Sequence, residues 1–131
     1  MTAIEISTDL APRSKSPLSQ AIRFGDLLFA SGQVATDPTT GHVVEGGIRE
    51  QTERVMENLK AVLEAGGSSL ENVLKCTCFL TDLGDFAAFN EVYARYFPGR
   101  RPARSAFGVA ALAGPYVVEV EAIAAIGEAG R

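Results

Sequence analysis

The longest periodic segment of the chain is a central one with apolar and small residues on one face. Between residues 48 and 63 these residues recur three or four positions apart, while glutamate and lysine occupy the other faces; they are Ile48, Thr52, Val55, Leu59, Val62 and Leu63. This spacing predicts an amphipathic α-helix. The pair Gly66-Gly67 follows directly, as expected at a helix C-terminus.

A second helix is predicted over residues 86–97 from a stripe of aromatic residues. The stripe comprises Phe86, Phe89, Tyr93 and either Tyr96 or Phe97, and Pro98-Gly99 stops the pattern. Asp85 is the expected N-cap. Large aromatic side chains at helical spacing usually belong to a hydrophobic core, so we interpret the stripe as core rather than as a stacking platform for a ligand.

Short alternating apolar runs predict strands on both sides of the helices. They cover residues 3–6, 21–24, 27–31, 73–81, 103–110 and 117–126, and Gly25-Asp26 marks a hairpin between the second and third. The resulting order is β-β-β-α-β-α-β-β. It predicts a single α+β domain over residues 1–131, in which both helices pack on one face of a mixed sheet.

The last predicted strand has two different faces. Val118, Val120, Ala122 and Ala124 alternate with Val117, Glu119, Glu121, Ile123 and Ala125. The first set suits a core beneath the helices. The second set is too apolar for open solvent and too charged for a dry core, which favours a hydrated interface between subunits. We therefore expect a homo-oligomer.

Charge and hydropathy exclude two classes of partner. The chain has 12 basic and 16 acidic residues, for a net charge of −4, and Arg100-Arg101 is its only adjacent basic pair. Nucleic-acid binding is not expected, because no basic surface could neutralise phosphates. Apolar stretches are too short to span a bilayer, and no signal-peptide pattern precedes them. The expected location is the cytoplasm.

The two cysteines are predicted to be core residues. Cys76 and Cys78 are two positions apart in a strand, so their side chains share a face, on which Leu74 and Leu80 are also expected. Free thiols suit a reducing compartment. A zinc site would need further ligands that the neighbouring sequence does not supply.

The remaining candidates for chemistry are one arginine and one glutamate. The sole histidine, His42, lies in a polar turn, and no phosphate-binding glycine loop is present. Arg104 and Glu119 instead interrupt apolar strands. A guanidinium can bind a carboxylate through two hydrogen bonds, and a desolvated carboxylate can take a proton from water. Hydrolysis of a small organic acid without a metal is one interpretation; a salt bridge between neighbouring strands is equally compatible with the spacing.

Motifs along nearly the whole chain resemble the RidA/YjgF family of enamine/imine deaminases. They include Ser31-Gly32-Gln33, Asn58 to Ala65, Phe79 to Asp82, Asn90 to Tyr93, Pro102 to Ser105 and Val118 to Ala124. The resemblance implies a chorismate-mutase-like fold and a homotrimer with clefts between subunits. It also implies hydrolysis of 2-imino and 2-enamino acids to 2-oxo acids and ammonia, without a cofactor.

The resemblance also assigns roles to individual residues. Arg104 matches the arginine that binds the substrate carboxylate, and Glu119 matches the acid that positions the attacking water. Ser31 and Gly32 match residues at the end of a strand lining the pocket. Asn90 matches an asparagine near the cleft, and Ala106 occupies a position that is often cysteine, where backbone contact is expected.

The chain departs from the family pattern at two positions. Leu18 stands where many members have tyrosine, and Gly108 stands where many have glutamate. With Leu18 in place of tyrosine the pocket loses a hydroxyl group, which weakens the prediction of a small imino acid substrate. Tyr116 is a less favoured candidate to supply a hydroxyl from another direction. The alternatives are a different substrate, of the 3-aminoacrylate or aminomuconate type, and a non-catalytic trimer that binds 2-oxo acids or partner proteins.

Overall fold

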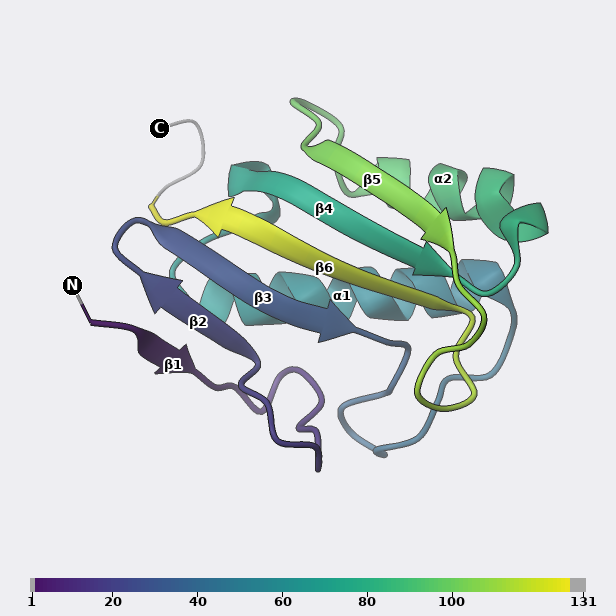
Figure 1. The fold of residues 1–131 in the computed structure, drawn as a ribbon, viewed down its shortest axis with the longest axis horizontal. Coiled ribbons are helices and arrows are strands. Elements are labelled where there is room, and N and C mark those ends of the chain that lie inside the picture. The colour runs from purple at the N-terminus through teal and green to yellow at the C-terminus, as the bar shows by residue number, and fades with distance from the viewer. Residues whose placement is uncertain (1, 128–131) are drawn as a thin grey trace.

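The computed structural model describes residues 2–127, which form one mixed sheet backed by two helices (Figure 1). The strands, in the order in which they lie across the sheet, are β1 (Ile4–Ile6), β2 (Ala21–Phe24), β3 (Leu27–Gln33), β6 (Val118–Ala125), β4 (Val73–Leu80) and β5 (Ala103–Gly108). Only β4 and β5 run parallel; the other neighbours are antiparallel. The predicted α+β fold and element order are confirmed.

Helix α1 (Ile48–Ala65) supplies much of the core, as its periodicity predicted. Its inward face buries Val55, Met56, Leu59, Val62 and Leu63 completely against the sheet. The expected glycine end is also confirmed. Gly66 is the C-cap, and Gly67 has a φ of +87°, a left-handed conformation that favours glycine.

Helix α2 (Phe86–Arg95) directs its aromatic residues inward. The ring of Tyr93 lies 5.4 Å from that of Phe89 and 4.9 Å from that of Phe97, between centroids, and all are buried. The core interpretation is therefore confirmed. Asp85 occupies the predicted N-cap position of this helix, although its side chain makes no capping hydrogen bond. Asp82 instead accepts a hydrogen bond from Gly84 N, in a 3₁₀ turn before the helix (Leu83–Asp85).

Strand β6 has the two faces that the sequence predicts. Val118, Val120, Ala122 and Ala124 are buried beneath the helices, while Glu119, Glu121 and Ile123 point to the opposite side. We call that opposite side the open face, because both helices lie behind the sheet (Figure 1). Neither helix among the described residues is long and apolar enough to cross a membrane.

One residue of β4 was assigned to the wrong face. Leu74 was expected in the core with the cysteines, but 41% of its surface is exposed and Val73 is buried in its place. The pairing of β4 with β6 shifts register between residues 73 and 75, which changes the face at that point. Cys76 and Cys78 are free and buried, and burial raises the pKa of the Cys78 thiol to about 12.

The open face is unusually apolar for a surface without a covering layer. Leu27, Phe29, Phe107 and Ile123 are all partly exposed there, and Phe29 and Phe107 expose 43% and 49% of their surface. The Phe79 and Phe107 rings pack together with centroids 5.8 Å apart. An apolar patch of this kind is typical of a surface that meets another protein chain.

Candidate active site

Glu119 lies near the start of β6, on the open face and beside Gly32 of β3. Its side chain is half-buried. Burial raises the pKa of its carboxyl above the usual range, and the negative charge of Glu121 adds to the effect. A carboxylate with a raised pKa is a better proton acceptor, so this environment suits a general base.

The Glu119 carboxyl occupies the space that a side chain at residue 32 would take. A Cβ atom at residue 32 would lie 2.8 Å from Cδ of Glu119, which is closer than real Cβ contacts come. The absent side chain therefore makes room for the carboxyl group. This gives a physical reason for glycine in the Ser31-Gly32-Gln33 segment that the sequence alone did not supply.

Gly32→Ala is expected to lower kcat/KM by about 100-fold for a reaction in which Glu119 accepts a proton, because a displacement of roughly 1 Å at a reacting group costs that much. The measurement is the steady-state rate with an imino acid of the kind that the resemblance to the RidA/YjgF family implies. Gly99→Ala is the matched control, since nothing lies within 4 Å of a Cβ placed there. Equal activity of both variants would show that the position of the Glu119 carboxyl is unimportant.

Glu119 and Gly32 line a cavity of about 610 Å³ that also contains Leu18, Thr36 and Tyr116. Residues 12–16 form another part of its wall. The volume is within the usual range for small-molecule sites. Leu18 contributes an apolar side chain, 53% exposed, so the residue that departs from the family pattern belongs to the same cavity as Glu119.

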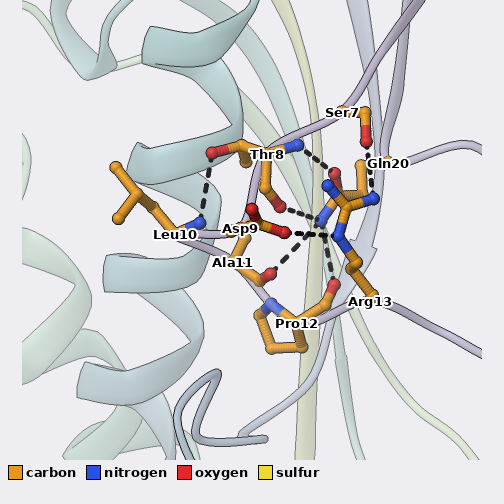
Figure 2. A network of polar contacts seen from close by, with 8 residues as sticks. All are labelled: Ser7, Thr8, Asp9, Leu10, Ala11, Pro12, Arg13 and Gln20. Atoms are coloured by element: carbon orange, nitrogen blue, oxygen red, sulfur yellow. Dashed lines mark hydrogen bonds and ion pairs between the residues drawn. The ribbon is translucent and has the colours of Figure 1, made fainter.

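The loop that walls this cavity is held in place by the buried side chain of Gln20. The Gln20 amide nitrogen donates to the carbonyl oxygens of Thr8, Ala11 and Pro12, and its oxygen accepts from Thr8 N at 2.7 Å (Figure 2). Sequence reasoning gave Gln20 no role. A glutamine between a polar loop and a strand does not reveal this role in the sequence, because its hydrogen-bond partners are backbone groups, which every residue has.

Arg104 lies on β5 and points toward helix α2. Its Nη1 donates to Oδ1 of Asn90 at 2.8 Å. The guanidinium carbon lies 5.0 Å from the ring centroid of Tyr93, 5.4 Å from that of Phe86 and 5.9 Å from that of Phe89. These rings and the amide fix the cation without neutralising it. Arg104 and Asn90 both line a second cavity of about 370 Å³.

Arg104 and Glu119 do not meet within one chain. Strand β4 separates β5 from β6, and Arg104 is in register with Cys76, whereas Glu119 is in register with Phe79. The two residues are therefore about 10 Å apart across the sheet, about 10 Å apart along it, and on opposite faces. The salt bridge considered from the sequence is wrong: none of the ion pairs among residues 2–127 joins them.

The two remaining candidate residues, Ser31 and Ala106, line neither cavity of the single chain. Ser31 donates its hydroxyl to the Ser19 carbonyl at 2.6 Å, and its backbone nitrogen donates to Gln20 O at 3.0 Å, so it connects β3 to the loop. Ala106 follows Arg104 by two residues on the helix side of β5 and is paired in register with Cys78. Within residues 2–127 no cluster of histidine, cysteine, aspartate or glutamate could hold a metal ion.

The chain is similar to known proteins over most of its length. The family model described as Endoribonuclease L-PSP matches residues 8–126. A mouse protein named 2-iminobutanoate/2-iminopropanoate deaminase is 44% identical, over 93% of this chain and 90% of its own. The crystal structure of RidA from an Antarctic Psychrobacter is 45% identical with a TM-score of 0.91, covering 94% of this chain and 99% of its own. E. coli TdcF with bound serine is 38% identical with a TM-score of 0.89, covering 93% and 98%.

Proposed function

The chain belongs to the RidA/YjgF family, and we propose that it hydrolyses reactive 2-imino and 2-enamino acids to 2-oxo acids and ammonia. The observation that carries the proposal is the half-buried Glu119 carboxyl, which lies beside Gly32 in a cavity of small-molecule size. Names of close relatives support the reaction: a second one, from Arabidopsis, is named Reactive Intermediate Deaminase A.

Arg104 binds the substrate carboxylate in this proposal. Asn90 accepts from one guanidinium nitrogen, so the other nitrogens are available for two parallel hydrogen bonds to a planar carboxylate. The guanidinium remains charged at every physiological pH. A relative solved with serine in place supports the idea that this fold holds a small amino acid-like ligand.

Glu119 acts on the water that attacks the imine carbon. The imine reacts in its protonated form: Glu119 takes one proton from the water as the new C–O bond forms and the C=N electron pair moves to nitrogen, giving a neutral carbinolamine. Returning that proton to nitrogen makes ammonia the leaving group. The C–N bond then breaks, the hydroxyl proton is lost and the 2-oxo acid forms. An enamine first tautomerises to the imine by protonation at its β-carbon. Each substrate molecule consumes one water and releases one ammonia.

A site that needs both residues requires a second copy of the chain. Because Arg104 and Glu119 lie on opposite faces of one sheet, we infer that Arg104 of one subunit completes the Glu119 cavity of its neighbour. The apolar open face offers a surface for such an assembly, and the resemblance to the family favours a homotrimer. The proposed molecule therefore has one composite site for each pair of neighbouring subunits.

The direct test is an assay in which threonine dehydratase generates 2-iminobutanoate in the presence of semicarbazide. We expect the protein to suppress semicarbazone formation by converting the imine to 2-oxobutanoate before it is trapped. Heat-denatured protein at the same concentration is the control. Undiminished semicarbazone formation with folded protein would contradict the proposal for small alkyl imino acids.

The pH dependence of kcat/KM is expected to report the ionisation of Glu119. The base must be charged to accept a proton, so activity falls as the pH drops through its pKa, which burial raises above the ordinary value of 4.5. The acid limb of the profile is therefore expected at a higher pH than for an exposed glutamate. Glu121→Gln removes a neighbouring negative charge and is expected to move this limb to lower pH. No movement in that variant would contradict the assignment of the limb to Glu119.

A further inference from the structure

The Glu119 cavity contains a second polar group, formed by two hydroxyls far apart in the sequence. Oη of Tyr116 and Oγ1 of Thr36 are 2.6 Å apart, and both residues line the cavity with Glu119 and Leu18. Tyr116 follows the turn before β6, whereas Thr36 follows β3. Neither residue has a part in the reaction described above.

The backbone segments that carry the two hydroxyls are held by buried amides of helix α1. Oε1 of Gln51 accepts from Val117 N at 2.9 Å, next to Tyr116, and Nδ2 of Asn58 donates to Thr36 O at 2.8 Å. Gln51 is 5% exposed and Asn58 is fully buried. Because these amides are seven residues apart on one helix, they fix the two hydroxyl-bearing segments to the same rigid element.

The turn before β6 is also shaped around the Tyr116 ring. Gly114 has a φ of +122°, and a Cβ atom there would lie 2.7 Å from Cε2 of Tyr116. A side chain at residue 114 would therefore displace the ring. The position of the phenol in the cavity thus depends on a glycine with a conformation that other residues rarely adopt.

The pair retains hydrogen-bonding capacity for a ligand. Two hydroxyls carry two hydrogens, and one of these is used between them. The other hydrogen and the remaining lone pairs are free to serve a polar group in the cavity. Leu18 offers no hydrogen bond, so Tyr116 and Thr36 are the side-chain hydroxyls best fixed to orient a ligand near Glu119.

Building on the proposed function, we propose that the Tyr116–Thr36 pair selects the side chain of the substrate. The preferred substrates are 2-imino acids whose side chain ends in a carbonyl, amide or hydroxyl group, and alkyl imino acids are disfavoured. Both hydroxyls line the cavity that contains Glu119, so a polar group of this kind would meet them beside the reacting carbon. A site that hydrogen-bonds a substrate group discriminates against analogues lacking it, because its own polar atoms are then left unpaired.

The test compares two imino acids of nearly equal shape, generated from asparagine and from leucine by an L-amino-acid oxidase with catalase present. We expect wild-type kcat/KM to favour the asparagine-derived imine by about 5- to 10-fold, the value of one hydrogen bond. This ratio is expected to fall to about 1 in Tyr116→Phe and in Thr36→Val, and to be retained in Thr36→Ser. A purely structural bridge between the two segments would change thermal stability but not the ratio.

Binding of the corresponding 2-oxo acids, 2-oxosuccinamate and 4-methyl-2-oxopentanoate, provides a readout that needs no turnover. If the wild type prefers 2-oxosuccinamate and Tyr116→Phe abolishes that preference, the pair selects the ligand side chain. This conclusion would stand even if the protein hydrolysed no imine, including 2-iminobutanoate, in which case only the proposed function would fail. Two results would overturn the assignment of this pair. One is a wild type that binds both 2-oxo acids with equal affinity and hydrolyses both imines at equal rates. The other is a ratio of kcat/KM values for the two imines that is unchanged in both Tyr116→Phe and Thr36→Val.

Discussion

Arg104→Ala is expected to lower kcat/KM for 2-imino acids by roughly 10²–10⁴-fold while the chain remains folded. Each charge-assisted hydrogen bond to the substrate carboxylate contributes about 1.5–3 kcal/mol, and alanine removes two of them. Among the described residues that line the Arg104 cavity, no other positively charged side chain is held by a hydrogen bond like the one between Arg104 and Asn90.

Arg101→Ala is the matched control for this prediction. Arg101 lines the same cavity as Arg104 but is exposed to solvent. Steady-state rates and thermal unfolding would be measured for both variants, with Arg104→Lys as an intermediate case that keeps the charge and loses the two parallel hydrogen bonds. Near-wild-type turnover in Arg104→Ala would show that the carboxylate is bound elsewhere.

Glu119→Gln is expected to lower kcat by roughly 10²–10⁴-fold with little change in the affinity for 2-oxo acids. Glutamine has nearly the same shape but cannot take the proton of the attacking water, so chemistry is lost while Arg104 still binds the carboxylate. Single-turnover rates and equilibrium binding of 2-oxobutanoate would separate the two effects.

The control for Glu119 is Glu121→Gln, on the same face of β6 and two residues along. At neutral pH this exposed residue is expected to be dispensable for turnover. Wild-type kcat in Glu119→Gln would refute the role of the carboxylate. A non-catalytic trimer that only binds 2-oxo acids would show no turnover in the wild type and unchanged binding in this variant.

Elements whose periodicity is strong were predictable from the sequence. Helix α1 and the two faces of β6 follow the expected pattern, because burial in a core imposes a fixed period on the chain. Three buried residues of α1 were missed from the sequence: Gln51, Met56 and Asn58. The face of Leu74 was not predictable, since a register shift within β4 reverses the alternation and leaves no mark in composition. The N-cap position of α2 at Asp85 was also predictable, whereas the capping hydrogen bond of Asp82 belongs to the 3₁₀ turn before that helix, which was not predicted from the sequence.

The candidate site was predictable in residue type but not in spatial arrangement. Arg104 and Glu119 stand out as charges in apolar strands, yet the sequence does not reveal that β4 inserts between β5 and β6. Strand order depends on long-range pairing, which local patterns do not encode. The hydroxyl pair of Tyr116 and Thr36 was hidden for the same reason, because its members are 80 residues apart.

The measurement that tests the composite site most directly is complementation between two inactive variants. Arg104→Ala and Glu119→Gln chains would be mixed in equal amounts, unfolded and refolded together, and assayed with 2-iminobutanoate. If Arg104 of one subunit serves Glu119 of the next in a cyclic trimer, random assembly leaves about one quarter of the sites with both residues, and about one quarter of wild-type activity returns. If both residues act within one chain, every subunit lacks one of them; the refolded mixture would then stay inactive, which would contradict the account.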